Sequence, residues 1–308
     1  MILAVCLNPA LDITYRTESI RPASSHAVEV VGERAGGKGI NVARVLNQMG
    51  VPTTVTGLLG GARGTELTVD LDHAGVRHSF SAVAGQNRRA VAVFDDEDAT
   101  VFNEPGPVVC ADEWTNFLDH YWRLLSDAAV VTLSGSIPPG LGTGAYATLI
   151  GLARGAGVPV VVDAGGVVLT KALSERPTLV APNLVEAASA LGRAIDGPDD
   201  IERAAADLRD LGAENVVISS GPNGLVCRSG AGSWVAKPSH RVSGNPTGAG
   251  DALTAALALG LFRGEDWPTM LRTGIGWAAG AVASHCAGEI DEGVAAQVAR
   301  DSALEELG

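Results

Sequence analysis

Five short stretches of the chain consist almost entirely of apolar residues, mostly valine, isoleucine and leucine. They occupy residues 1–7, 128–135, 158–164, 177–183 and 215–221. Short apolar runs of this kind are typical of strands in a parallel sheet, because helices cover both faces of such a sheet. Stretches with helical periodicity lie between and after them, at residues 39–49, 65–74, 112–126, 143–156, 184–192, 199–211, 250–263 and 268–287. This alternation predicts an α/β fold with a doubly wound, mainly parallel sheet and helices on both faces.

Two further segments, residues 12–35 and 78–107, alternate apolar and polar positions instead. Such alternation is typical of antiparallel strands with one exposed face. We therefore expect a small sheet that stands off the main domain as a lid or as a dimer face. The alternative is that these strands simply extend the main sheet. Because no Pro-, Gly- or Ser-rich linker divides the chain, we expect one domain over residues 1–308, with the lid strands inserted in it.

Charge and cysteine content narrow the function classes. The formal net charge is −13, so the chain has no bulk electrostatic footprint for nucleic acid. An anionic substrate would have to be held by a few local cations or backbone N–H groups. The four cysteines form no C-x-x-C pair, and the first residues lack a basic secretory region, which favours a reduced, cytoplasmic setting. The apolar run 271–287 contains Arg272 and many small residues, so it indicates a buried helix and no membrane association.

The sequence TGAGD at residues 247–251 joins a turn of small residues to a long apolar helix. Gly248, Ala249 and Gly250 would let backbone N–H groups face outward together at the helix start, where the helix dipole adds positive potential. Such a turn suits the charge that develops on a phosphoryl group. Asp251 in the first turn could take a proton from a substrate hydroxyl. The alternative is an ordinary N-cap formed by Thr247 or Asp251.

Three other segments follow predicted strands and could bind ligands, because ligands of open α/β sheets bind at the carboxyl ends of strands. The stretch ISSGPNG at 218–224 could bind a nucleotide through Ser220, Gly221 and Gly224, or could be a plain hairpin turn. Asp12, in LNPALD at 7–12, could accept hydrogen bonds from a polyol, or could end a turn. Ser136 lies in LSGSIPPG at 133–140, before a rigid Pro-Pro turn.

Asn183 and Glu186 follow another predicted strand, at the start of a predicted helix. Together they could position hydrated Mg²⁺ and a phosphate. The alternative, which the spacing alone favours, is a capping box that only begins the helix. The stretch GERAGGKGIN at 32–41 resembles a P-loop until Gly39, which stands where a Mg²⁺-binding hydroxyl would be required. Its glycines suit a backbone turn against a small polar ligand.

Taken in order, the motifs LNPALD, GGKGINVARVLNQMG, LSGSIPPG, PNLVE, ISSGPNG and TGAGD resemble those of the phosphofructokinase B (ribokinase-like) sugar kinases. The opening L-N-P-A-x-D and the lysine in G-G-K-G-x-N are most similar to the branch of 1-phosphofructokinase and tagatose-6-phosphate kinase. The resemblance covers nearly the whole chain. It implies a ribokinase-like fold, ATP-dependent phosphorylation of a sugar hydroxyl with Mg²⁺, and a β-sheet lid that often forms a homodimer interface.

The same resemblance implies a role for individual residues. It makes Asp251 the catalytic base and the turn before it the anion hole. On the acceptor side it implies sugar-hydroxyl contacts from Asp12, Gly37 and Asn41, with Lys38 beside them for an acceptor phosphate. Arg88, Arg89 and Ser136 are further candidates to hold that phosphate. On the nucleotide side it implies contacts to the nucleotide from Asn183, Ser220, Gly221 and Gly224. It also implies that Glu186 serves Mg²⁺ and that Ala279 and Ala283 flank adenine. A monovalent cation near the anion hole is a further possibility.

The chain departs from this branch at three positions. Where a lid strand of the branch carries R-x-N-x-K, residues 88–93 read RRAVAV, so that Ala90 and Ala92 replace the Asn and the Lys. Each lost charge-assisted contact to phosphate would cost about 1.5–3 kcal/mol. Ala181 stands where the branch has a lysine that approaches ATP. The leading expectation is a kinase of fructose 1-phosphate, fructose 6-phosphate or tagatose 6-phosphate. The alternatives are a kinase of an unphosphorylated sugar or nucleoside, and a non-catalytic binding protein.

Overall fold

A computed structural model gives the structure of the protein and describes residues 1–95, 99–284 and 286–307. Its main sheet has ten strands in the order β14-β13-β12-β11-β10-β9-β8-β1-β4-β5. Neighbours from β11 to β5 pair in parallel, whereas β12, β13 and β14 pair antiparallel. The strands are β1 (Ile2–Cys6), β4 (Thr53–Leu59), β5 (Ser81–Ala82), β8 (Val130–Ser134), β9 (Val160–Asp163), β10 (Leu179–Val180), β11 (Val216–Ser219), β12 (Leu225–Arg228), β13 (Ser233–Lys237) and β14 (Ala303–Leu307).

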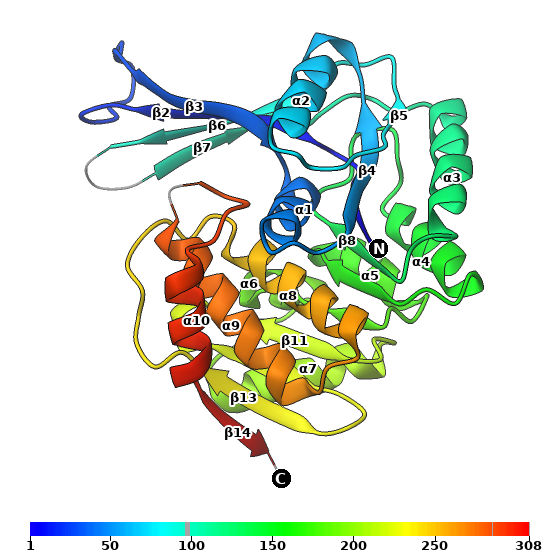
Figure 1. Cartoon of the computed structure of the whole chain (residues 1–308), viewed down its shortest axis with the longest axis vertical. Coiled ribbons are helices and arrows are strands. Elements are labelled where there is room, and N and C mark those ends of the chain that lie inside the picture. Colours follow the sequence, from blue (N-terminus) through cyan, green and yellow to red (C-terminus); the bar gives the residue numbers. More distant parts are fainter. Residues whose placement is uncertain (96–98, 285, 308) are drawn as a thin grey trace.

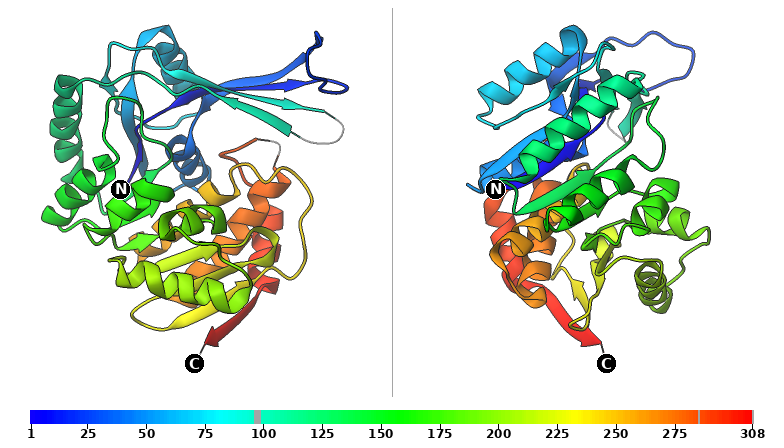
Figure 2. Two further views of the ribbon diagram at one scale, coloured as in Figure 1. Left: turned by 180° about the vertical axis from the view of Figure 1, so that it is seen from behind. Right: turned by 90° about the vertical axis from the view of Figure 1, so that its right-hand side faces the viewer.

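Helices cover both faces of this sheet, which confirms the doubly wound arrangement (Figures 1 and 2). One apolar core joins alternate residues of β1 to α1 (Lys38–Gln48), α2 (Gly61–His73), α8 (Ala249–Arg263), α9 (Trp267–Ala283) and α10 (Glu292–Asp301). The other core joins the intervening β1 residues to α3 (Ala111–Leu125), α4 (Ala145–Gly155), α5 (Gly166–Leu173), α6 (Leu184–Leu191) and α7 (Pro198–Asp210). Both faces of β1 are therefore buried, as its continuous apolar sequence predicts.

A second, four-stranded sheet projects from the main body, with the order β3-β2-β6-β7 (Figure 1). Its strands are β2 (Ala10–Arg16), β3 (Glu29–Gly36), β6 (Arg88–Phe94) and β7 (Ala99–Asn103). The alternative that these strands extend the main sheet is therefore wrong. Two parts of the prediction need correction. Strand β5 pairs in parallel with β4 of the main sheet. Within the small sheet, β2 and β6 pair in parallel, and only the β2–β3 and β6–β7 pairs are antiparallel as expected. Residues 96–98 of the 78–107 segment lie outside the described residues.

Several elements were missed by the sequence pattern. Strand β4 contains threonines that interrupt its apolar run, yet Thr54 and Thr56 are buried, since β-branched side chains pack well inside a sheet. Helices α5 and α10, strand β13 and the edge strand β14 also went unpredicted. The last long helix ends at Ala283, before the predicted end at 287, and residue 285 lies outside the described chain. Among the described helices, none combines the length and the apolar character that crossing a bilayer requires.

Candidate active site

Many of the predicted site residues lie at the carboxyl ends of the parallel strands of the main sheet or at the starts of the helices there, whereas Asp12 and Arg88 lie in the small sheet and Ala279 and Ala283 lie on α9. Three side-chain contacts connect them across long distances in the sequence. Asn8, just after β1, donates from Nδ2 to Ser136 Oγ at 3.1 Å. Lys38, at the start of α1, bonds to Glu186 at the start of α6. Further along α1, Asn41 contacts Asp251 in the first turn of α8.

Asp251 is a buried carboxylate at the start of α8, with 5% of its surface exposed. Its Oδ2 accepts a hydrogen bond from Asn41 Nδ2 at 2.8 Å. Burial, followed by the nearby charge of Asp163, raises the pKa of Asp251 to about 7, although Lys38 and Asn41 oppose the shift. A carboxyl group with this pKa can accept a proton near neutral pH and release it again.

The turn before Asp251 has the geometry that the small residues predict. Gly248 takes the N-cap position of α8 with φ of +90°, in the left-handed region that glycine adopts readily. The alternative in which Thr247 or Asp251 caps the helix is therefore wrong. Ala249 and Gly250 begin the helix, so that their N–H groups belong to its first turn. The Ala249 N–H donates to the Pro246 oxygen at 3.2 Å.

Lys38 lies between two carboxylates that the sequence analysis did not join to it. Its Nζ is 3.0 Å from Asp163 Oδ1 and 2.8 Å from Glu186 Oε1. Burial alone would lower the pKa of Lys38, but Asp163, Glu186 and Asp251 together raise it well above its ordinary value. Lys38 therefore stays protonated and connects the predicted acceptor side to the predicted metal side.

Asp163 is a site residue that sequence reasoning missed. It ends β9, and its side chain is buried beside Lys38. Its Oδ2 is buried without a hydrogen-bond partner among the described residues. Burial raises the pKa of Asp163, the charge of Lys38 lowers it, and that of Glu186 raises it. The available signal was its position, since VVVD places an acid at the carboxyl end of a buried parallel strand.

Glu186 forms the capping box that its spacing favours. Its Oε2 accepts from the Asn183 backbone N–H at 3.0 Å, while Asn183 Oδ1 accepts from the Glu186 N–H at 2.9 Å, which completes a capping box. Its other oxygen, Oε1, reaches Lys38. The free oxygen of Asp163 and the Glu186 carboxylate fit a hydrated Mg²⁺, which proteins often hold with one or two carboxylates plus substrate phosphates. The described residues contain no cluster of three or more His, Cys, Asp or Glu suited to a metal.

The acceptor-side residues gather where the small sheet meets the body. Arg88 donates from Nε to the Asn8 backbone oxygen at 3.1 Å, and Asn8 in turn contacts Ser136. Asp12 lies in register with Ala90 of β6. Burial raises the pKa of Asp12 to about 6, and the charge of Arg88 is the largest effect opposing that rise. Asn8, which sequence reasoning missed, belongs to the same LNPALD motif as Asp12.

Two glycines of β3 provide a matched test of the Asp12 position. A Cβ added at Gly36 would lie 1.8 Å from Asp12 Oδ2, whereas a Cβ at Gly32 would meet nothing within 4 Å. We expect Gly36→Ala to displace the Asp12 carboxylate and to raise the KM for the acceptor about tenfold, as the loss of one hydrogen bond to a charged group does. The KM for ATP should stay unchanged, and steady-state kinetics measure both values. Gly32→Ala is the control, and an equal effect from both variants would contradict this placement.

The predicted nucleotide loop follows β11. A bridge between Asn183 and Ser219 places this loop beside the start of α6. Ser220 Oγ is buried, with no hydrogen-bond partner in the described chain. Gly224 has φ of +94°, and a Cβ there would lie 2.1 Å from the Ala236 oxygen, so only glycine fits between β11 and β13. The hairpin alternative is also realised, since β11 and β12 pair antiparallel.

Ala279 and Ala283 lie four residues apart on α9, so they share one face of that helix, and both are half-buried. A Cβ at Gly244 would lie 2.0 Å from the Val282 oxygen, so the segment leading to Gly248 passes against this end of α9. The end of α9 that carries Ala283 therefore lies near the segment leading to the α8 turn, and the place of the two alanines beside adenine stays a prediction.

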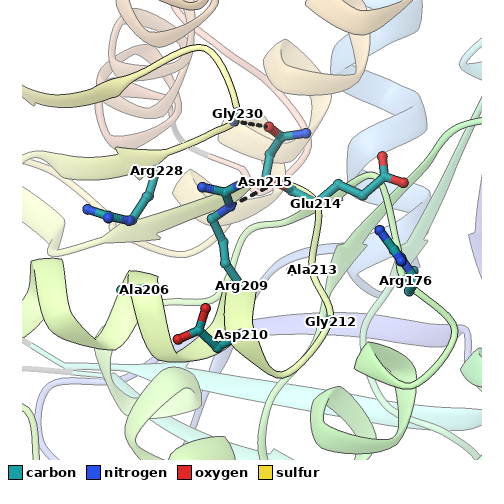
Figure 3. A pocket seen from close by; sticks show the side chains of 10 residues that line it. All are labelled: Arg176, Ala206, Arg209, Asp210, Gly212, Ala213, Glu214, Asn215, Arg228 and Gly230. Carbon is teal, nitrogen blue, oxygen red and sulfur yellow. Dashed lines mark hydrogen bonds between the residues drawn. The ribbon is translucent and has the colours of Figure 1, made fainter.

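A hollow of about 750 Å³ lies elsewhere, beside the amino end of β11 (Figure 3). It is polar, and its charged lining residues are Arg176, Arg209, Asp210, Glu214 and Arg228. Arg209 donates there to the backbone oxygens of Glu214 and Ser229. Of the residues described as lining it, none is a predicted site residue. This hollow is therefore separate from the candidate active site.

Comparisons with known proteins agree with this geometry. The profile of the pfkB family of carbohydrate kinases matches residues 1–292. Phosphofructokinase-2 from Escherichia coli in complex with potassium has a TM-score of 0.92 at 27% identity, over 97% of this chain and 98% of that one. Two further structures of the same protein match with the same identity and coverage. The TM-score is 0.88 for its complex with fructose-6-phosphate and 0.90 for its tetrameric inhibited form. A protein described as a possible 1-phosphofructokinase from Thermotoga maritima gives 0.91 at 28% identity, over 100% of this chain and 99% of that one.

Proposed function

Because this chain belongs to the pfkB family of carbohydrate kinases and is an ATP-dependent sugar kinase, we propose that its acceptor is a ketohexose phosphate. The candidates are fructose 1-phosphate, fructose 6-phosphate and tagatose 6-phosphate. The observation that carries the chemistry is the buried Asp251, which Asn41 holds directly behind the Gly248 turn. The fructose-6-phosphate complex of the similar phosphofructokinase-2 supports this acceptor class.

In the proposed reaction, the acceptor hydroxyl oxygen forms a bond to the γ-phosphorus of ATP while the bond from that phosphorus to the departing ADP breaks. The hydroxyl proton passes to Asp251, whose pKa of about 7 suits a base near neutral pH. The N–H groups of the turn formed by Gly248, Ala249 and Gly250 face the charge that grows on the transferred phosphoryl group. Asp12, Gly37 and Asn41 orient the acceptor hydroxyls.

The residues that would hold Mg²⁺ are Glu186 and Asp163, with Asn183 fixing the Glu186 carboxylate through the capping box. When bound, the ion neutralises charge on the ATP phosphates. Ser220, Gly221 and Gly224 form the proposed nucleotide loop, with Ala279 and Ala283 flanking adenine. Ala181 is 6% exposed and lacks the lysine side chain that approaches ATP in the similar branch. We therefore assign the contacts to the ATP phosphates to this nucleotide loop and to Lys38.

We assign the acceptor's phosphate to Arg88 and Ser136. Asn8 connects these two residues, because its backbone oxygen accepts from Arg88 and its Nδ2 donates to Ser136 Oγ. Ala90 and Ala92 lack the polar side chains of the similar branch, so this group must hold the phosphate with fewer contacts. The same two alanines favour the second candidate function, a kinase of an unphosphorylated sugar or nucleoside. A non-catalytic binding protein is the third candidate, and the intact Asp251 site opposes it.

Arg88→Gln separates the first two candidates. If Arg88 binds an acceptor phosphate, the variant should lower kcat/KM for a ketohexose phosphate about 10- to 100-fold, the usual cost of losing a charge-assisted bond. The kcat/KM for unphosphorylated fructose should change much less. Steady-state ADP release measures both, and Arg89→Gln, on the same strand, is the matched control because Arg89 pairs with Glu104 on the exposed surface. An equal loss for both sugars would refute the assignment.

The products test the proposed reaction itself. Wild-type protein should consume Mg-ATP with at least one of the three ketohexose phosphates, and ³¹P NMR of the sugar product should show two phosphomonoester signals. The proposal is abandoned if ATP is consumed only with unphosphorylated sugars or nucleosides, which would favour the second candidate. Tight binding of ATP and a phosphosugar without any turnover would favour the third.

We further propose that the small sheet forms a homodimer interface in a cytoplasmic enzyme. Val30, Val31, Val101 and Phe102 of this sheet are each more than half exposed, which is unusual for apolar residues without a partner. The similar phosphofructokinase-2 has a tetrameric form. Sedimentation equilibrium should give a dimer, and a Val30→Asp, Val31→Asp double variant should give a monomer. A monomeric wild type would contradict the interface.

The potassium complex of that relative supports a monovalent cation here as well. Replacing K⁺ by tetramethylammonium should then lower kcat, and an unchanged kcat would count against it. For the cytoplasmic setting, the four free cysteines are the supporting observation. Fractionation of the source cells tests it, and recovery of the protein outside the cytoplasm would contradict it.

A further inference from the structure

Arg34 and Glu289 form an ion pair between the small sheet and the body of the protein. Arg34 Nη1 lies 2.9 Å from Glu289 Oε1. Arg34 belongs to β3, in direct register with Asp12 on β2, so both side chains lie on the same face of the small sheet. Glu289 lies between α9 and α10, more than 250 residues later in the chain. The pair therefore connects the acceptor side of the small sheet to a distant segment of the body.

The backbone next to Arg34 is fixed to the body. The Ala35 N–H donates to Asp70 Oδ2 at 2.8 Å, and the Ala35 oxygen accepts from Arg44 Nε at 3.3 Å. Arg44 and Asp70 also pair with each other. Ala35 is therefore held by both α1 and α2. Arg34 is the neighbouring residue of β3, and its side chain makes the next contact between the small sheet and the body.

The segment that carries Glu289, residues 286–290, packs against the catalytic elements. A Cβ added at Gly248 would lie 3.1 Å from Ala287, and one added at Gly288 would lie 3.1 Å from Asn41 Oδ1. Asn41 is the residue that holds Asp251. Two hydrogen bonds between Gln48 and Ile290 tie the far end of the segment to α1. The 286–290 segment is thus in contact with the turn before Asp251 and with the amide that positions Asp251.

We propose that the Arg34–Glu289 pair couples the position of the small sheet over the acceptor to the Gly248 turn. The two residues act as positioning residues, because they reach the reacting groups through the 286–290 segment. Arg34 Nη2 is buried and has no partner within the described part of the chain, whereas Arg34 Nη1 donates to Glu289. The inference takes from the proposed function only the phosphoryl-binding role of the Gly248 turn, and it is independent of the acceptor's identity.

Hydrogen exchange on the full-length protein tests this coupling without any acceptor. In the wild type, Mg²⁺ with the non-hydrolysable ATP analogue AMP-PNP should slow amide exchange both in the nucleotide loop and in β2 and β3 of the small sheet. In Arg34→Gln and Glu289→Gln, AMP-PNP should still slow amide exchange in the nucleotide loop. The factor by which it slows exchange in β2 and β3 should fall about threefold, because a half-exposed ion pair contributes a free energy of this scale. The double variant Arg34→Glu, Glu289→Arg should recover much of it.

A matched control is Glu175→Gln, which removes the ion pair with Arg154 on the outer surface and should leave the exchange pattern unchanged. Thermal unfolding of each variant checks that it is folded. The coupling is overturned if both single variants keep full slowing in β2 and β3, or if the wild-type sheet does not respond to AMP-PNP. A swapped double variant no better than the single ones would also overturn it. Failure of the proposed acceptor would instead appear as absent phosphosugar turnover with this exchange response intact.

Discussion

Asp251→Asn is expected to reduce kcat about 1,000-fold with the best acceptor, while the KM for ATP changes little. The reason is that the amide keeps the size of the side chain and a hydrogen bond to Asn41, but it cannot take the acceptor's proton. General bases of this kind contribute roughly 10²- to 10⁴-fold. ADP release under saturating substrates measures the effect. Asp266→Asn is the matched control, since Asp266 caps α9 through the Thr269 N–H and asparagine caps equally well. Retention of full activity in Asp251→Asn would exclude the assigned base.

The pH dependence gives the same prediction a second readout. Because the pKa of Asp251 is raised to about 7 and the base must be ionised, wild-type kcat/KM should fall as the pH drops below about 7. The folding stability of the protein should change with pH in the opposite direction to its activity. A raised pKa in the folded state contributes stability below the ordinary value near 4, and this contribution is lost as the pH rises through about 7. Asp251→Asn should therefore unfold at a higher temperature than the wild type at pH 8, although it is inactive.

Lys38→Met is the second variant with a large expected effect. It leaves the buried Asp163 without its counter-charge and removes a cation near the reacting groups. We expect kcat/KM to fall about 100-fold, in the range measured when one donor to a developing charge is removed. Lys38 also lowers the pKa of Asp251, so its removal should move the acid limb of the pH profile to higher pH.

The stability cost of Lys38→Met should be about 2 kcal/mol at pH 8, less than for a fully buried pair because the lysine side chain is 35% exposed. Chemical unfolding measures it. Lys171→Met, on the exposed surface of α5, should change neither activity nor stability. Lys38→Arg should recover part of the activity, because it keeps the charge. If Lys38→Met retained wild-type kinetics and an unshifted pH profile, Lys38 would have no role in the site.

The fold could be predicted because its dominant signals are local. Continuous apolar runs such as residues 158–164 became buried parallel strands, and alternating runs became the small sheet. Strand β4 was not predicted, because its threonines are polar residues in the sequence pattern, although Thr56 is fully buried in the structure. Strand β5 was not assigned to the main sheet, because a strand of two residues is too short for its sequence pattern to distinguish a main-sheet strand from a strand of the small sheet.

The candidate site could be predicted residue by residue, but its connections could not. Asp251 and Glu186 were predicted from local sequence features of helix starts, namely the small residues before Asp251 and the capping residue before Glu186. The Asn41–Asp251 bond joins residues 210 apart in the chain, and only the fold brings them together. Asp163 was missed for the same reason, because a single acid after a strand gains meaning only once Lys38 lies beside it.

The central claim is that this kinase recognises a phosphorylated ketohexose through Arg88 and its neighbours. The most direct test is the ratio of kcat/KM for fructose 6-phosphate to that for fructose, measured by ADP release with wild-type protein at one saturating Mg-ATP concentration. The same ratios for fructose 1-phosphate and fructose, and for tagatose 6-phosphate and tagatose, extend the test to the other two candidate acceptors. We predict that at least one phosphosugar is preferred by a factor of about ten or more, as one charge-assisted phosphate contact provides. Equal values, or a preference for the unphosphorylated sugars, would contradict the account.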